Sequence, residues 1–180
     1  IAHVQAGIVT SDLQEAVEKL NLFYPPDPSS IRHSTIGGNI ACNAGGPRCL
    51  KYGVTGDYVL GLTVVLADGR VLKTGGKVIK DVVGMDLSAL FTGSEGTLGI
   101  ITEALLRLTA KPAYARTALV EFASLPDACN TVNAILSAGI LPATLELMDQ
   151  TAITCIEEAM HLGLPMDIEA ILLIEADGSN

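Results

Sequence analysis

Residues 25–46 constrain the fold more than any other part of this sequence, because they combine prolines and glycines with few charges. The stretch holds four glycines and three prolines. Proline fixes φ and glycine permits positive φ, so a defined irregular backbone is expected. Small side chains let a ligand approach the main chain, and free N–H groups at a helix start can bind a phosphate. A nucleotide-like cofactor is therefore predicted to lie at the motifs Pro-Pro-Asp-Pro-Ser-Ser (25–30), Ser-Thr-Ile-Gly-Gly-Asn (34–39) and Asn-Ala-Gly-Gly (43–46).

A second glycine-rich segment spans residues 91–103. It places Gly93, Gly96 and Gly99 three residues apart, immediately before an apolar run. In the Rossmann dinucleotide motif the glycines follow a strand and open a helix, which is the opposite order. A Walker loop is excluded because no Gly-Lys-Ser/Thr follows at the required spacing. The segment therefore predicts a glycine turn that leads into a strand.

Composition narrows the class of protein. The chain has 180 residues, of which 49% are hydrophobic and 17% are charged, so it is typical of a globular protein. The net charge of −9 and the scattered Lys and Arg residues argue against nucleic-acid binding. No apolar run is long enough for a membrane span, so no transmembrane segment is predicted. The start lacks both an initiator Met and a signal-peptide pattern, which indicates a piece of a longer or processed protein.

The cysteines and histidines give no metal-binding pattern. Cysteines occur at positions 42, 49, 129 and 155 and form no Cys-x-x-Cys pair. Histidines occur at positions 3, 33 and 161, far from one another in sequence. Reduced thiols in a cytosolic-type compartment are therefore expected, with no metal site in this sequence.

Periodicity predicts the elements of the first part of the chain. A strand is expected over 4–9, and a helix over 11–20 with a capping box between Ser11 and Gln14. A short helix can follow Gly38. Two strands flank the Asp68-Gly69 hairpin step. These expected elements are the strands 59–66 and 70–74, a helical turn at 86–90 and a strand over 100–108.

Lys111-Pro112 is the predicted domain boundary, because the glycine-rich pattern gives way there to regular alternation. A strand, helix, strand, helix, strand order follows. The first helix has Pro126 in its first turn and the second is capped by Asp149. This order predicts a sheet covered by helices. The expected bounds are 116–122, 126–137, 144–148, 149–160 and 170–175.

Six segments in order resemble one family, the FAD-linked oxidases of the vanillyl-alcohol oxidase or PCMH type, and within it the glycolate oxidase flavoprotein subunits and D-lactate dehydrogenases. The segments cover nearly the whole chain, which makes the resemblance far more specific than a single glycine motif. They are Tyr-Pro-Pro-Asp-Pro-Ser-Ser (24–30), Ser-Thr-Ile-Gly-Gly-Asn (34–39), Asn-Ala-Gly-Gly (43–46), Leu-Lys-Tyr-Gly (50–53), Leu-Phe-Thr-Gly-Ser-Glu-Gly-Thr-Leu-Gly (90–99) and Leu-Glu-Leu-Met-Asp (145–149).

The resemblance implies an α+β fold. Residues 1–112 would form the second part of a PCMH-type FAD-binding domain, and residues 113–180 the start of a ferredoxin-like cap domain. Two family hallmarks are absent: an upstream glycine-rich diphosphate loop and a downstream histidine-containing segment. The base and the metal ligands are therefore expected outside this sequence, and no catalytic residue is assigned within it.

The resemblance also implies a function. An FAD-dependent dehydrogenase or oxidase of the glycolate or D-lactate type would pass a hydride from a small 2-hydroxyacid to non-covalently bound FAD. An electron acceptor or partner subunit is expected, and a cytoplasmic location with membrane association only through a partner. The alternatives are a non-catalytic subunit that keeps the FAD fold, or another flavin reductase of the same fold.

The residues expected to bind the cofactor lie in the matched motifs or, for Thr55 and Ile101, just after them. Gly38 is expected to need positive φ and close approach, and Glu95 to be buried among glycines. His33 is expected to be a loop residue rather than a covalent flavin attachment, and the carboxylates of Glu146 and Asp149 to cap a helix rather than act as an acid–base pair. The residues expected to bind the cofactor are Pro26, Asp27, Ser30, Thr35, Gly37, Gly38, Asn39, Asn43, Gly46, Thr55, Glu95, Gly99 and Ile101.

Overall fold

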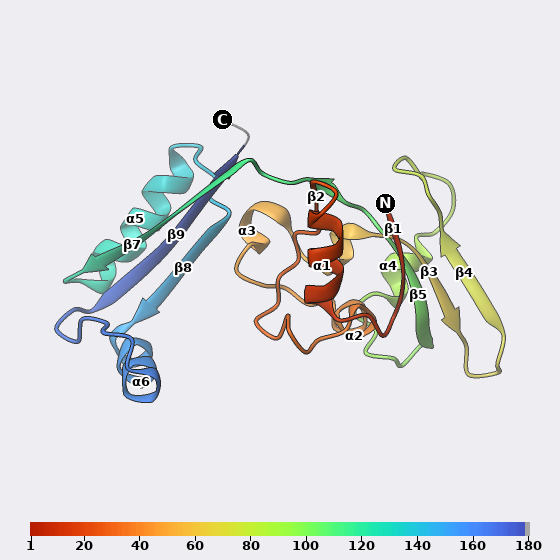
Figure 1. Ribbon diagram of the computed structural model, residues 1–180, viewed down its shortest axis with the longest axis horizontal. Coiled ribbons are helices and arrows are strands. Elements are labelled where there is room, and N and C mark those ends of the chain that lie inside the picture. The colour runs from red at the N-terminus through yellow and green to blue at the C-terminus, as the bar shows by residue number, and fades with distance from the viewer. Residues whose placement is uncertain (179–180) are drawn as a thin grey trace. The chain divides into compact units, whose positions relative to one another are not determined.

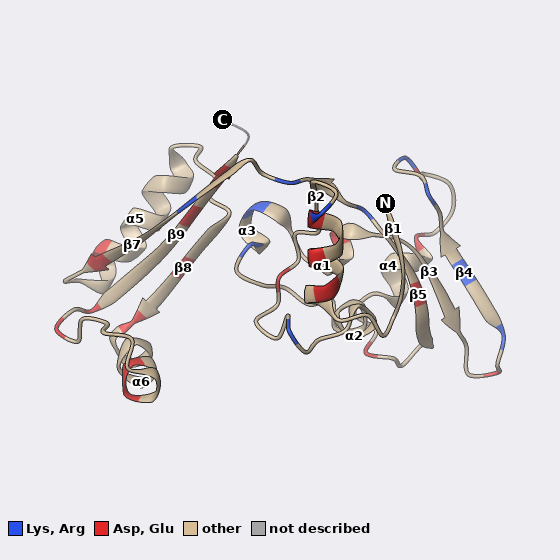
Figure 2. Cartoon of the chain, viewed as in Figure 1, with Lys and Arg blue, Asp and Glu red and all other residues tan. Residues whose placement is uncertain are grey.

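The computed structural model describes residues 1–178, and their contacts divide into two compact units (Figure 1). The first unit runs from Ile1 to Lys111 and the second begins at Pro112. Each unit has its own sheet and helices, so the chain is a mixed α and β protein, as the sequence predicted. Ten of the eleven Lys and Arg residues lie in the first unit and Arg116 lies in the second, whereas acidic side chains are frequent on both α1 and α6 (Figure 2).

The first unit is built on a four-stranded antiparallel sheet. Its strand order is β1-β5-β3-β4, so the first strand pairs with the last long strand of the unit. Strands β3 and β4 form the predicted hairpin, whose turn uses Gly69 at a φ of 83°. The strands are β1 (Ala2–Gln5), β3 (Val59–Val65), β4 (Val71–Gly75) and β5 (Ile100–Leu106).

Short helices and a two-stranded ladder complete this unit. Long irregular segments connect them, as the proline and glycine content predicted. A cluster of buried apolar side chains joins the sheet to α1, α2 and α4, and includes Leu13, Ile36, Ile40, Val64 and Leu106. The elements are α1 (Thr10–Glu18), β2 (Leu22–Phe23), α2 (Ile36–Cys42), α3 (Cys49–Tyr52), the 3₁₀ turn η1 (Thr55–Tyr58), α4 (Leu87–Phe91) and β6 (Thr109–Ala110).

Two sequence-based expectations for the start of the chain are wrong. Strand β1 ends at Gln5 instead of continuing to Val9, because the carbonyls of Ala6 and Ile8 accept hydrogen bonds from the start of α2. The capping box of α1 does not form. The N–H of Ser11 donates to the carbonyl of Ile31 at 3.1 Å. The side chain of Gln14 donates to the carbonyls of Tyr24 and Pro26 instead.

The second unit has the predicted strand and helix order. Its three strands form an antiparallel sheet in the order β7-β9-β8, and β9 pairs with both neighbours along its length. Helix α5 contacts all three strands and α6 contacts β8 and β9, so helices cover the sheet as expected. The elements are β7 (Tyr114–Phe122), α5 (Leu125–Ser137), β8 (Thr144–Asp149), α6 (Gln150–Met160) and β9 (Ala170–Gly178).

The caps of the second unit also follow the sequence. Pro126 lies in the first turn of α5, where its missing N–H costs no helical hydrogen bond. The Asp149 carboxylate accepts a hydrogen bond from the N–H of Ala152 at 2.8 Å and so caps α6. No helix among residues 1–178 is long and apolar enough to cross a membrane.

Candidate cofactor site

Helix α2 is the centre of the candidate site, and backbone hydrogen bonds fix its start against the end of β1. The N–H of Gly37 donates to the carbonyl of Ala6 at 2.8 Å, and that of Ile36 to the carbonyl of Ile8 at 2.9 Å. Thr35 caps the helix by accepting from the N–H of Gly38 at 3.3 Å. Gly37 lies so close to Ala6 that a Cβ at this position would be 2.6 Å from the Ala6 Cβ. This contact requires glycine.

The other end of α2 gathers two more glycine-rich segments. The N–H of Gly93 donates to the carbonyl of Ile40 at 2.9 Å, and that of Glu95 to the carbonyl of Ala41 at 2.8 Å. The helix ends at Asn43 in the left-handed conformation, with a φ of 48°. The Asn43 side chain accepts a hydrogen bond from the N–H of Gly56 at 2.8 Å. Motifs far apart in sequence therefore meet around one short helix.

Two of the predicted site residues point into the protein, and the hydroxyl of a third caps a helix. Asn39 is 3% exposed, and its Nδ2 donates to the Thr10 hydroxyl at 2.7 Å. Thr55 is fully buried and its hydroxyl donates to the carbonyl of Ala44 at 2.8 Å. The Thr35 hydroxyl is occupied by the helix cap. Their side chains hold the loops in place, and so support the site instead of forming its surface.

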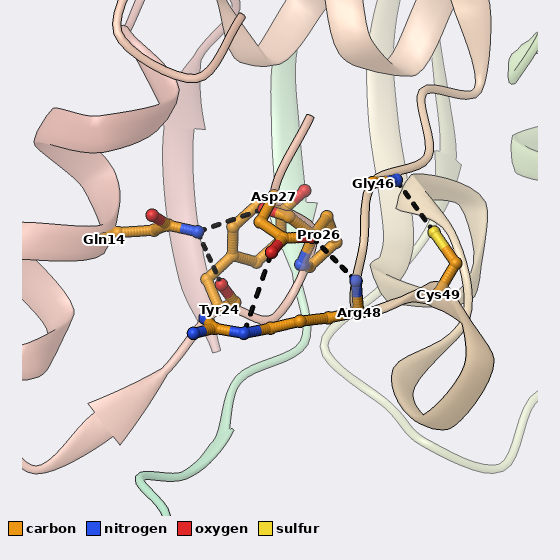
Figure 3. A network of polar contacts seen from close by, with 7 residues as sticks. All are labelled: Gln14, Tyr24, Pro26, Asp27, Gly46, Arg48 and Cys49. Atoms are coloured by element: carbon orange, nitrogen blue, oxygen red, sulfur yellow. Dashed lines mark hydrogen bonds and ion pairs between the residues drawn. The ribbon is translucent and has the colours of Figure 1, made fainter. Parts of the chain in front are cut away.

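The Pro-Pro-Asp loop lies between α1 and residues 46–48 (Figure 3). On one side the Gln14 amide donates to the carbonyls of Tyr24 and Pro26, each at 3.0 Å. On the other side the Asp27 carboxylate accepts from the Arg48 N–H at 3.3 Å and lies 3.7 Å from Arg48 Nε. The Arg48 guanidinium also sits 5.6 Å from the centroid of the Phe23 ring.

Gly46 packs directly against the backbone of Asp27. A Cβ at this position would collide with the backbone carbonyl of Asp27, so only glycine permits the approach. The Gly46 N–H donates to Cys49 Sγ at 2.9 Å. Gly46 therefore has a packing role within the fold.

Two expectations about glycine chemistry are wrong. Gly38 lies inside α2 and has no positive φ, because the chain is already helical there. The N–H groups of Gly37, Gly38 and Asn39 each have a partner within the fold, so they are not the free phosphate donors that the sequence predicted. A ligand would instead meet the open side of Gly38, where a Cβ would contact only the Thr35 hydroxyl, at 3.4 Å.

The turn around Glu95 also differs from the expectation. Glu95 is exposed rather than buried among glycines, and it adopts a φ of 53°, which is unusual for a non-glycine residue. The neighbouring Gly96 is exposed, and a Cβ there would meet nothing within 4 Å. The turn therefore presents an open surface, held from behind by α2. Ser30 is exposed on its own loop.

Gly99 immediately precedes β5, and Ile101 is the second residue of that strand. A Cβ at Gly99 would be 2.7 Å from Val64 Cγ1 and 3.0 Å from the carbonyl of Val65, so Gly99 packs against β3. Ile101 is half-buried against the core and pairs with Val64 in the ladder between β5 and β3. Both residues therefore have a packing role within the sheet of the first unit.

A group of buried aromatic residues lies behind the Pro-Pro-Asp loop. Tyr24 is fully buried and packs edge-to-face on Tyr58, with ring centroids 5.8 Å apart. Burial raises the pKa of the Tyr24 phenol, and Thr55 beside it offsets this only in part. The Tyr24 hydroxyl has no hydrogen bond of acceptable geometry within residues 1–178. Burial likewise raises the pKa of Tyr58, whose hydroxyl donates to the carbonyl of Tyr52 at 2.7 Å.

His33 is exposed in the loop before α2, and Asp149 caps α6, as expected. Residues 1–178 hold no group of His, Cys, Asp or Glu with the geometry of a metal site.

The sequence analysis assigned no role in the site to Gln14, Tyr24 or Arg48. A signal for Gln14 was present, because two adjacent prolines supply no N–H and leave their neighbours' carbonyls in need of outside donors. Nothing in the sequence pairs Arg48 with Asp27.

Comparison with known families and proteins agrees with this architecture. Residues 1–75 match the model of an FAD binding domain, and residues 111–180 match that of the C-terminal domain of FAD linked oxidases. The chain therefore belongs to the FAD-linked oxidases, which confirms the resemblance seen in its motifs.

Individual relatives are similar over almost the whole chain. Glycolate oxidase subunit GlcD of Bacillus subtilis is 55% identical over 177 residues, 98% of this chain and 38% of the relative. Its namesake in Escherichia coli K12 is 47% identical, over 98% of this chain and 35% of the relative. The D-lactate dehydrogenase of Anaerostipes hadrus is 38% identical, over 100% of this chain and 39% of the relative. The chain thus spans less than two fifths of the length of these relatives.

Solved structures show the same fold. Alkyldihydroxyacetonephosphate synthase matches with a TM-score of 0.81 at 24% identity, over 98% of this chain and 34% of that chain. This likeness confirms the expected PCMH-type fold class.

Proposed function

We propose that the full gene product containing these residues is an FAD-dependent dehydrogenase or oxidase of a small 2-hydroxyacid, with glycolate and D-lactate as the first candidates. The single observation that carries the proposal is the convergence of the glycine-rich segments on α2, with Gly38 and Gly96 open. The names of the similar relatives supply the substrate class.

Within this proposal the two units have different roles. Residues 1–112 contribute to the FAD-binding domain and residues 113–180 begin the cap domain. The division of contacts at Lys111 and Pro112, and the two family matches, support this assignment.

The residues proposed to meet FAD fall into two groups. Asp27, Ser30, Gly38 and Glu95 would form its contact surface. The others would support that surface from behind: Pro26, Thr35, Gly37, Asn39, Asn43, Gly46, Thr55, Gly99 and Ile101. These residues fit an approach by van der Waals contact, because Gly38 and Gly96 leave room that a side chain would fill.

The chemistry follows from that division. When bound, FAD supplies the hydride acceptor, and the protein supplies position and electrostatics. This chain's residues would hold the cofactor and exclude water behind it. The neutral phenol of Tyr24 and the pairing of Arg48 with Asp27 keep the wall free of an uncompensated buried charge. The base and any metal ligands are proposed to lie elsewhere in the gene product.

Partner and location complete the proposal. The electron acceptor is a small molecule or a partner subunit, as the word subunit in the relatives' names suggests. Cysteines 42, 49, 129 and 155 are all free thiols, which supports a reducing, cytoplasmic location. Any membrane contact is proposed to occur only through a partner.

The test uses the full gene product. Its visible spectrum is expected to show bound flavin, which acid denaturation and filtration release from the protein. Glycolate, D-lactate and 2-hydroxyglutarate, each with an artificial dye as acceptor, are expected to identify the substrate. A protein that retains no flavin, or that reduces the dye with none of these acids, contradicts the proposal.

A further inference from the structure

Gln14 makes an unusual pair of contacts with the Pro-Pro-Asp loop. Its side-chain Nε2 donates both of its hydrogens to this loop, to the carbonyls of Tyr24 and Pro26, each at 3.0 Å (Figure 3). Gln14 lies in α1, outside every glycine-rich motif, and is only half-buried. One amide thus spans the Pro-Pro step from outside the loop.

The loop needs such an external donor. Pro25 and Pro26 are almost fully buried, and neither has a backbone N–H, so the segment cannot pair its own carbonyls as a strand or helix would. A buried carbonyl without a donor costs free energy. The Gln14 amide meets two such carbonyls at once and thereby fixes how far the loop stands from α1.

The opposite side of the loop is fixed independently. Asp27 is held by Arg48, and its backbone lies against Gly46. The loop is therefore held from two sides: Gln14 holds its backbone carbonyls, and Arg48 holds the Asp27 carboxylate. Immediately beyond the clamp, Ser29 and Ser30 are exposed.

We propose that Gln14 is a positioning residue for the FAD wall formed by Asp27 and Ser30, which follow the buried Pro25-Pro26 step. This inference rests on the proposed function. It assigns to Gln14 a role in the geometry of the bound cofactor, beyond its contribution to folding. Gln14 itself does not touch the cofactor.

Gln14→Glu is the sharpest variant, because it keeps the shape and replaces two donors by a carboxylate that faces two carbonyls. We expect FAD affinity of the full gene product at pH 7.5 to fall about tenfold or more. Affinity should recover as the pH falls toward 5, because a protonated acid regains one donor. Gln150→Glu is the matched control, since it makes the same chemical change on exposed Gln150 at the start of α6. Gln14→Met removes the donors without adding charge.

Two further readouts separate positioning from simple stabilisation. In the apo-protein, hydrogen exchange of peptides covering residues 27–34 is expected to accelerate in both Gln14 variants and not in the control. At saturating FAD, the visible circular dichroism of the flavin is expected to differ from wild type, because the wall has moved.

Each outcome decides the proposal. Weaker binding, faster loop exchange and an altered flavin spectrum together support it. Unchanged affinity in Gln14→Glu and Gln14→Met overturns it, as does weaker binding with an unchanged spectrum, which indicates stabilisation alone. Failure of both variants to fold also overturns it. If the wild type binds no FAD, the proposed function fails instead, and loop exchange still reports whether Gln14 holds the loop.

Discussion

The two units of this chain stabilise their backbones in different ways. In the second unit, β9 pairs with β7 and β8 over long continuous ladders, so hydrogen bonding is repetitive and shared among many residues. In the first unit, the segments around α2 are irregular and are held by single contacts such as those of Gly46, Asn39 and Gln14. A ladder tolerates the loss of one contact, whereas a loop held by one close approach does not.

The largest expected effect is that of Gly46→Ala. The added Cβ would meet the backbone of Asp27, which cannot move aside without displacing the loop. We expect a loss of about 3 kcal/mol in the free energy of unfolding. Denaturant titration followed by hydrogen exchange should locate the loss in residues 1–111. Gly76→Ala is the control, because a Cβ there meets nothing within 4 Å. Equal stability of the two variants would contradict the single-contact view.

Alanine substitutions at the adjacent glycines of α2 should change the free energy of unfolding in opposite directions. Gly37→Ala would bring its Cβ against Ala6 and should cost about 2 kcal/mol. Gly38→Ala finds room in a helical position and should stabilise the apo-protein by roughly 0.5 kcal/mol. In the full gene product the same Gly38 variant should weaken FAD binding, because the methyl group occupies the proposed contact surface. Melting and FAD titration measure both. Loss of apo stability in Gly38→Ala would be the opposite result.

A helix cap is expected to matter less, and only in the second unit. Asp149→Ala removes the acceptor of the Ala152 N–H and should cost about 1 kcal/mol. Asp149→Asn should restore most of this, since asparagine caps equally well. Hydrogen exchange should show the loss in α6, with residues 1–111 unchanged. An effect that spreads through the first unit would break the distinction between the units.

The smallest expected effect is a pH-dependent contribution of Glu103, in the sheet of the first unit, to the free energy of unfolding. Glu103 accepts a hydrogen bond from the Thr63 hydroxyl at 3.1 Å and lies 3.4 Å from His3 Nε2, and these contacts lower its pKa. A lowered folded-state pKa gives stability that is present above the ordinary glutamate range and is lost as the pH falls through the lowered value. Glu103→Gln should therefore be slightly less stable at neutral pH, with the difference shrinking below about pH 4. Melting temperatures across this range measure it, and a constant difference would argue against the carboxylate.

Much of the fold could be predicted from local pattern. The Asp68-Gly69 hairpin and the capped helix after Asp149 each follow from a few adjacent residues, and the structure confirms both. The capping box at Ser11 failed, because a tertiary hydrogen bond to Ile31 competed for the same N–H.

The candidate site was predicted less completely. Its segments were recognised in order, but the roles of individual residues depend on which way each side chain points. Asn39 turns inward to Thr10, and Glu95 turns outward. Whether these residues bind FAD stays a prediction.

The sequence by itself determined the family, the mixed α and β class and the presence of the glycine-rich and proline-rich segments. These depend on residue type and order, which are local properties. Only the tertiary structure decided that Gly37 and Gly46 serve packing while Gly38 stays open, and that Gln14 reaches across to the Pro-Pro-Asp loop. The reason is that a close approach or a long-range hydrogen bond has two partners, and the sequence alone does not state which segments will meet.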